Sequence, residues 1–186
     1  MPTKPTLEAL TTRGSPTDTN TIVNLELVRK FMAKVPFQYA ITSAYRSPEY
    51  NRSIGGSSSS QHPNGLAVDI VPNGMTSREL ATWFWIHKDS YSELDQVIWY
   101  RNTRHLHLGI CPTGASNCIG GAPRKDFYAA SSEGLGYDRW APTQAEIDSV
   151  NARFPQGKPL PWGWILGAGA LTIVTGLGAY FYIRSR

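Results

Sequence analysis

The sequence predicts an α+β domain with a small, mostly antiparallel sheet and flanking helices, followed by one apolar C-terminal helix. Segments with a helical hydrophobic period alternate with short apolar segments that are typical of strands. The last two predicted strands follow each other directly, which favours antiparallel pairing. One long C-terminal segment carries no charge, whereas the preceding chain is largely polar. With 186 residues, the chain has room for about one domain.

The first half of the predicted domain alternates helix and strand. Apolar residues at helical spacing predict a helix over residues 21–35, and Pro36 ends it. Residues 38–44 are typical of a short strand. Ser47 and Pro48 then supply a capping residue and a first-turn proline, so a short helix is expected to begin there.

The second half contains the remaining strands. Residues 66–71 form an apolar segment that one acid interrupts, and this predicts a buried strand. Thr76 and Glu79 have the spacing of a capping box and open the next helix. Two further strands are expected, at residues 96–100 and 106–110. Beyond them, the sequence predicts mostly loop over residues 112–160, with one short helix at 143–150.

The C-terminal segment has the features of a membrane-spanning helix. The 22 residues from Trp162 to Ile183 carry no charge. A helix of this length spans about 33 Å, which is enough for a hydrocarbon core of about 30 Å. Tryptophans at one end and tyrosines at the other are typical of interfacial belts. The alternative is a buried core helix. Gly163 and Gly167 form a GxxxG pair, which predicts possible helix-mediated self-association.

These features divide the chain into five parts and predict a single-pass protein anchored in a membrane by its C-terminus. The first twenty residues contain no apolar run of the kind found in signal peptides. The expected setting is a cell envelope or a virion membrane, with the side of the membrane left open. The predicted parts are an irregular segment (1–17), the domain (18–152), a proline-rich linker (153–161), the transmembrane helix (162–183) and a basic tail (184–186).

Charge and cysteine content exclude several classes of protein. The net charge is +4, and no long basic run is present, so we expect no nucleic-acid partner. The two cysteines are too few for a four-cysteine zinc module. Cys111 and Cys118 enclose six residues. Either a disulfide between them or two free thiols fits this spacing.

Histidines and an aspartate predict a metal site. Three of the four histidines lie in two short motifs, SSQHPNGLAVDI and RHLHLGI. Asp69 lies within an apolar strand, where a carboxylate needs a partner or a metal. Strand alternation places His105 and His107 on one face. Two imidazoles and a carboxylate suit Zn²⁺ with a fourth position open for water. An incidental HxH, and an Asp69 paired with an arginine, are the alternatives.

The stretch ITSAYRSPEYNRSIGGSSSSQHPNGLAVDI, followed by LDQVIWYRNTRHLHLGI, resembles the M15 peptidases. This family includes zinc D-Ala-D-Ala carboxypeptidases and L-Ala-D-Glu endopeptidases, and belongs to a wider group with the hedgehog domains. The resemblance covers about residues 20–112. It implies one bound Zn²⁺ held by His62, Asp69 and His107. It also implies that Arg46 contacts the substrate carboxylate or the oxyanion, and that the substrate is a peptidoglycan stem peptide or cross-link.

One position departs from the family pattern. Many members carry an acid three residues before the last histidine, where it acts as the general base. Here that position holds Arg104, which cannot accept a proton. His105 and Asp95 are the candidate replacements, and His105 is favoured. A turn or strand-start residue is the structural interpretation of Asp95.

Together these features predict a membrane-anchored zinc metallopeptidase that hydrolyses amide bonds of peptidoglycan, for cell-wall lysis or remodelling. A lytic enzyme of a membrane-containing phage fits this description. The alternative is a non-hydrolytic zinc-fold module that binds peptidoglycan or has a structural role, which Arg104 favours. A membrane-anchored assembly protein with an incidental HxH is a third possibility.

Overall fold

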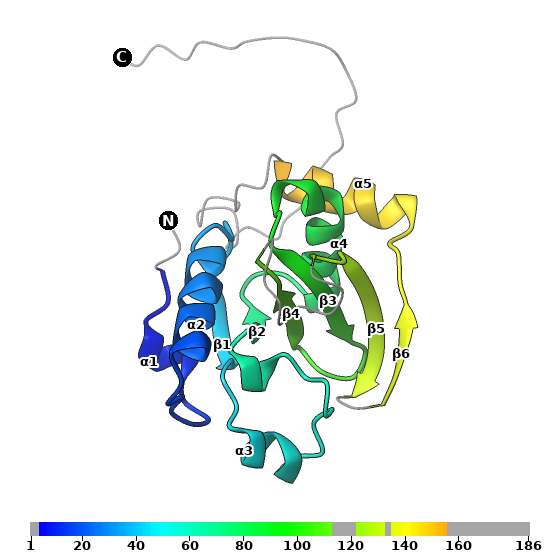
Figure 1. Ribbon diagram of the computed structural model, residues 1–186. Helices are drawn as coiled ribbons and strands as arrows, with labels where there is room; N and C mark the ends of the chain where they lie inside the picture. The colour runs from blue at the N-terminus through cyan, green and yellow to red at the C-terminus, as the bar shows by residue number, and fades with distance from the viewer. Residues whose placement is uncertain (1–3, 113–121, 133–134, 156–186) are drawn as a thin grey trace, which may run out of the picture.

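A six-stranded sheet forms the centre of the computed structural model, which describes residues 4–112, 122–132 and 135–155 (Figure 1). The strand order is β1-β2-β4-β3-β5-β6. Every neighbouring pair is antiparallel except β3 and β5, which are parallel. The strands are β1 (Tyr39–Ser43), β2 (Ala67–Pro72), β3 (Leu94–Tyr100), β4 (Leu106–Ile110), β5 (Asp126–Ser132) and β6 (Leu135–Arg139).

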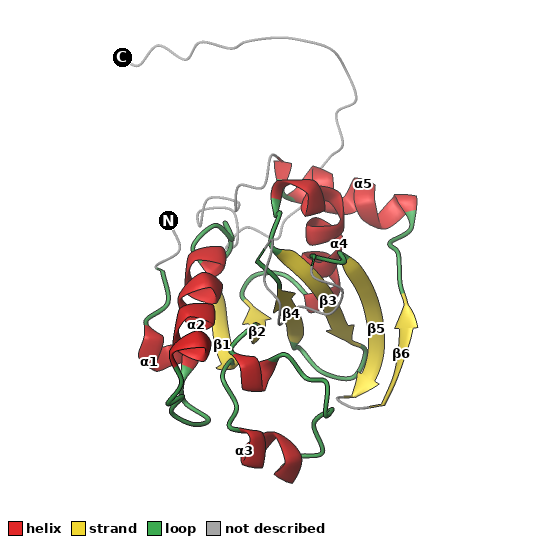
Figure 2. Ribbon diagram, viewed as in Figure 1, coloured by secondary structure: helices red, strands yellow, loops and turns green. Residues whose placement is uncertain are grey.

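Five α-helices accompany the sheet in the described part of the chain. As Figure 2 shows, α1 and α2 lie beside β1, while α4 and α5 lie together, with α4 against the central strands β2, β3 and β4. The helices are α1 (Leu7–Leu10), α2 (Thr19–Met32), α3 (Pro48–Ser53), α4 (Ser77–His87) and α5 (Gln144–Arg153). The predicted α+β architecture with a mostly antiparallel sheet is therefore confirmed.

The pleat of the central strands separates a core face from a site face. Alternate residues of β2, β3 and β4 enter one large apolar cluster together with residues of α2 and α4. The residues between them point to the opposite face. In the register of the three strands, Asp69 pairs with His107, and His107 pairs with Ile98. The sheet therefore holds its polar residues away from the core, on the face where they can form a site.

The N-terminal segment is more ordered than residues 1–17 were expected to be. Thr6 caps α1, and Leu10 at the end of that helix is buried in the main core. Two backbone hydrogen bonds then hold the chain around Arg46: Tyr45 N–H donates to Leu10 O at 2.9 Å, and Ser47 N–H donates to Arg13 O at 3.3 Å. This segment therefore supports a residue of the site.

Strands β5 and β6 correct the prediction of mostly loop over residues 112–160. β5 pairs in parallel with β3, with Phe127 opposite Val97, and Phe127 is buried in the main core. This pairing joins strands that are distant in the sequence, so local patterns indicate it weakly. The predicted helix at 143–150 is α5, which begins with a capping box of Thr143 and Glu146 and runs on to Arg153.

Several predictions fall outside the described residues. Most of the proline-rich linker, the apolar segment 162–183 and the basic tail lie there. Among the helices that are described, none has the length and apolar character that a bilayer crossing requires. Cys111 is disulfide-bonded, whereas Cys118 lies outside the described residues.

Candidate metal centre

His62, Asp69 and His107 converge on the site face of the sheet. His62 begins a short 3₁₀ turn, Asp69 lies in the middle of β2, and His107 lies in the adjacent strand β4. Each offers one ligand atom, and these atoms all lie within 4.8 Å of one another. The three residues are 2%, 2% and 7% exposed, respectively. Such a dense group of buried polar side chains requires compensation by hydrogen bonds or a metal.

Hydrogen bonds orient the two imidazoles. His62 Nδ1 donates to the carbonyl oxygen of Ala44 at 2.5 Å, so Nε2 is the ring nitrogen that faces the cluster. His62 Nε2 lies 3.2 Å from His107 Nδ1 and 3.2 Å from Asp69 Oδ2. His107 Nδ1 lies 2.8 Å from Asp69 Oδ1. Two ring nitrogens and a carboxylate therefore face a common point.

Electrostatics favour the protonation states that bind a cation. Burial alone would raise the pKa of Asp69, but the charges and hydrogen bonds of His62 and His107 outweigh it and hold the pKa well below its usual range. Desolvation lowers the pKa of His107, in spite of the opposing effect of Asp69. An ionised carboxylate beside neutral imidazole is the donor state that a divalent metal requires.

The donor set fits zinc. Two neutral imidazoles and one carboxylate are typical of catalytic zinc sites, in which a fourth position is left for water or substrate. The backbone carbonyl behind His62 is the kind of outer partner that fixes a ligand histidine. His62, Asp69 and His107, the set that the resemblance to the M15 peptidases implies, would hold the ion.

Arg46 lies directly beside this cluster. Its Nη2 donates to Asp69 Oδ2, and its Nε donates to Ser43 Oγ at 2.8 Å. The side chain is buried and also lines the adjoining cleft. The ion pair stabilises the buried negative charge of Asp69 and places a guanidinium near the metal ligands.

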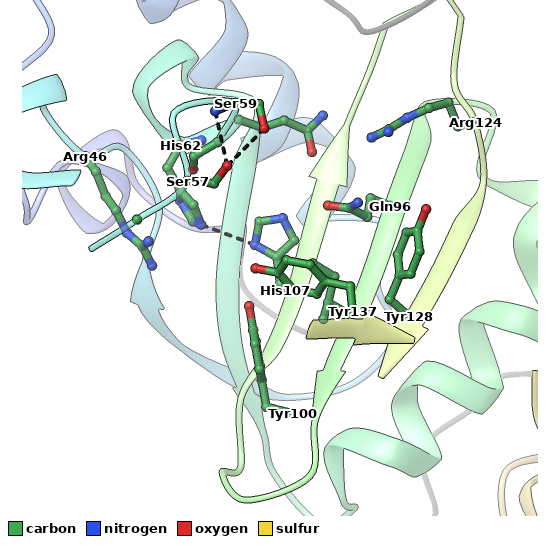
Figure 3. A pocket seen from close by; sticks show the side chains of 14 residues that line it. Arg46, Ser57, Ser59, His62, Gln96, Tyr100, His107, Arg124, Tyr128 and Tyr137 are labelled. Atoms are coloured by element: carbon green, nitrogen blue, oxygen red, sulfur yellow. Dashed lines mark hydrogen bonds between the residues drawn. The ribbon is translucent and has the colours of Figure 1, made fainter. Parts of the chain in front are cut away.

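A cleft of about 270 Å³ opens over the ligands (Figure 3). His62 and His107 lie on one side of it, and Arg124 and Tyr128 lie across from them. Two kinds of residue line the rest: serines of the loop before His62, and side chains of β3, β5 and β6. The lining residues are Arg46, Gly56, Ser57, Ser59, Ser60, Gln61, His62, Gln96, Ile98, Tyr100, His107, Arg124, Tyr128 and Tyr137.

The two candidate bases lie at the margins of this arrangement. His105 immediately precedes β4, is half-buried, and is not one of the residues that line the cleft. Asp95 lies near the start of β3 and is 1% exposed. Its two oxygens accept hydrogen bonds from Arg124 and Gln61. The structure thus gathers the three predicted ligands with Arg46 and places His105 and Asp95 outside the cleft lining.

Sequence reasoning missed one wall of the cleft. Arg124, Tyr128 and Tyr137 lie in a region that was expected to be mostly loop. The segment DFYAASS contains an apolar and aromatic stretch, and this is the local signal that could have indicated β5. Gln96 was placed in a strand but was not recognised as a site residue.

A comparison with protein families agrees with the geometry. Residues 7–109, more than half of the chain, match the family model described as Peptidase M15, and the chain belongs to this family. M15 peptidases are zinc-dependent, and the matched segment contains all three predicted ligands. No curated protein matches the chain significantly.

Proposed function

We propose that the chain is a zinc metallopeptidase that hydrolyses amide bonds in peptidoglycan stem peptides or cross-links. One observation carries the proposal: two buried imidazoles and a buried carboxylate converge beneath an open cleft. A structural zinc site would have four protein ligands, whereas the group found in the described part of the chain offers three. The family membership supports the peptide bond as the target.

The residues around the cluster fit amide hydrolysis. A zinc ion held by these residues would supply Lewis-acid chemistry and would make hydroxide available at about neutral pH. Arg46 holds Asp69 and contributes positive charge where an oxyanion develops. We propose His105 as the group that accepts a proton from the attacking water and returns it to the leaving amine. The position of His105 directly before β4 and two residues before His107 supports this role, although His105 is not one of the residues that line the cleft.

Zinc content and peptide cleavage test the proposal together. The full-length protein should hold one zinc per chain by elemental analysis and release peptides from muropeptides by mass analysis. His107→Ala should lose the zinc. His105→Ala should keep it but lose about 10²–10⁴-fold in cleavage rate, the contribution typical of a general base. His87→Ala serves as the control, since His87 lies at the end of α4 and does not line the cleft.

The outcomes separate enzyme from binding module. A protein without zinc would contradict the proposal entirely. Zinc without cleavage would favour the non-hydrolytic module, for which Arg104 in place of an acid is the supporting feature. Full activity of His105→Ala would contradict only the assignment of the base.

We further propose that residues 162–183 anchor the enzyme in the membrane of a cell envelope or a virion. The uncharged segment with aromatic ends supports this. An anchor would raise the effective concentration of the enzyme at the wall. Deletion of residues 162–186 should move the protein from the membrane fraction to the supernatant. Continued membrane association of the truncated protein would contradict the anchor.

A further inference from the structure

The cleft wall opposite the metal ligands contains a fixed cation. Arg124 and Tyr128 lie on this wall, Tyr137 also lines the cleft, and all three lie outside the segment that matches the family. In Figure 3, Arg124 points toward the ligand side of the cleft, and Tyr128 lies on the same wall with its hydroxyl toward Arg124. The ligand side therefore lies within the family segment, whereas this chain builds the opposite wall from β5, β6 and the residues just before them.

Asp95 holds Arg124 in place. Arg124 Nε lies 3.0 Å from Asp95 Oδ1, Nη2 lies 2.6 Å from Oδ2, and the backbone N–H of Arg124 donates to Oδ1 at 2.8 Å. Asp95 is 1% exposed, whereas the side chain of Arg124 remains 27% exposed. A buried carboxylate thus binds one edge of the guanidinium, and the side chain as a whole still reaches the cleft.

The edge of the Arg124 guanidinium that does not face Asp95 carries further N–H donors, including those of Nη1. Nη1 lies 3.9 Å from Asp126 Oδ2, which is beyond hydrogen-bond distance. Asp126 also pairs with Arg139 at 3.3 Å, so its charge is shared between two arginines. The five N–H donors of an arginine form a rigid fork, and the pair with Asp95 uses only one side of it. The other side has Asp126 at ion-pair distance and keeps N–H donors from which a further carboxylate can accept hydrogen bonds.

The same aspartate connects the two walls. Gln61 Nε2 donates to Asp95 Oδ2 at 3.1 Å, and Gln61 immediately precedes the ligand His62. Asp95 therefore fixes Arg124 relative to the turn that carries a metal ligand. Tyr128 and Tyr137 add aromatic surface to the cleft, with the centroids of their rings 6.3 Å apart.

From this geometry we infer that Arg124 binds a carboxylate of the substrate and so selects acidic peptides, with Asp95 as its positioning residue. The inference rests on the proposed function, since it names the kind of peptide that the same cleft takes. Arg46 already donates to Asp69 beside the candidate metal ligands. Arg124 is instead fixed at the far wall, where it would bind a substrate carboxylate away from the scissile bond.

Paired substrates test the inference. The stem peptide is prepared with each carboxylate replaced, one at a time, by the carboxamide, and kcat/KM is measured with the full-length protein. A charge-assisted hydrogen bond predicts that one replacement lowers kcat/KM by about 10–100-fold. Arg124→Gln should reduce that preference to about one. Arg101→Gln is the matched control, because Arg101 also pairs with an aspartate, Asp138, but does not line the cleft.

Asp95→Asn tests the positioning role. It should weaken the preference for the carboxylate and raise KM more than it lowers kcat, because Arg124 is then less well fixed. Arg124→Lys should restore only part of the preference, since an ammonium lacks the two-edged fork. A purely structural role of Asp95 would lower the rates on both peptides of a pair equally. Thermal unfolding of each variant shows whether it is folded.

The outcomes distinguish this inference from the proposed function. Cleavage of every peptide at the same rate by the wild type, or an unchanged preference in Arg124→Gln, would overturn the inference alone. If no peptide is cleaved, the peptidase proposal fails. Calorimetric titration with the same peptide pair then decides the inference: tighter binding of the carboxylate that Arg124→Gln abolishes would support it, and equal binding would overturn it.

Discussion

Gly109 controls how closely the Gln61 side chain approaches β4. A Cβ at position 109 would lie 2.0 Å from Gln61 Oε1 and 3.2 Å from the Cβ of Gln96. Gln61 cannot simply turn away without cost, because its Nε2 donates to the buried Asp95. The absence of a side chain at position 109 therefore lets the amide reach the aspartate.

Gly109→Ala should destabilise the protein by about 1–3 kcal/mol, the usual cost of overpacking. The free energy of unfolding in urea measures this. The same substitution in a Gln61→Ala background removes the clash, so its cost there should be much smaller. An equal cost in both backgrounds would show that Gln61 is not the obstacle.

The metal ligands were predictable from local sequence, whereas Arg124 was not. One acid in an apolar strand indicates Asp69, and strand alternation indicates the pair His105 and His107. The resemblance to the M15 peptidases then implies His107, together with His62, as the ligands. Arg124 acquires its role from Asp95, which lies 29 positions earlier in the chain. That pairing depends on the parallel contact of β3 with β5, which no local pattern specifies.

At the scale of elements, α4 and α5 each have a capping box at their own start and are joined by two ion pairs. Thr76 and Glu79 form a capping box on α4, and Thr143 and Glu146 form one on α5. Each glutamate also forms an ion pair with an arginine of the other helix: Glu79 with Arg153 of α5, and Glu146 with Arg78 of α4. Each of the two glutamates therefore stabilises the start of its own helix and also the contact between α4 and α5.

Thr76→Ala should lower the free energy of unfolding by about 1 kcal/mol, because Thr76 Oγ1 accepts from the backbone N–H of Glu79. Guanidinium denaturation measures the loss. The exposed Thr12 provides a control, and Thr12→Ala should change the stability by less than about 0.5 kcal/mol. Equal effects of the two substitutions would contradict the importance of the cap.

Helix starts were predicted better than the last two strands. The spacing of Thr76 and Glu79 is a local pattern that spans four residues. The capping box that it predicts at the start of α4 is confirmed. By contrast, β6 (Leu135–Arg139) is short and exposed, and it pairs only with β5 among the described strands. A short exposed strand has little hydrophobic alternation from which to recognise it.

At the scale of the whole molecule, the buried site makes stability depend on pH. The pKa of His107 lies below its ordinary value of 6.5 because of burial, so the unfolded chain binds this proton first as pH falls. The metal-free protein should therefore lose stability as pH decreases below about 6.5. The lowered pKa of Asp69 adds a further loss below its ordinary value of 3.8.

Denaturation of the metal-free protein between pH 7.5 and 5 measures the first effect. His107→Gln should flatten the dependence. Burial also lowers the pKa of His87, which contributes with the same sign, so His87→Gln is measured alongside. A slope that persists in the double variant would assign the dependence to other groups.

Zinc should stabilise the whole domain, since binding to the folded chain alone shifts the unfolding equilibrium. The gain is about 2.7 kcal/mol at a zinc concentration of 100 times Kd. Thermal unfolding with zinc and with a chelator measures it. His107→Ala should unfold at the same temperature in both, and a retained difference would place the ion elsewhere.

Because Asp69 pairs with His107 across β2 and β4, binding of the metal should also select the native register of these two strands. Sliding one strand past the other by a single position would turn Asp69 toward the core and an aliphatic neighbour toward the ligands. A chain aligned in that way could not bind the ion. Free zinc in the refolding mixture should therefore enrich the native alignment, and the bound fraction should count correctly assembled molecules.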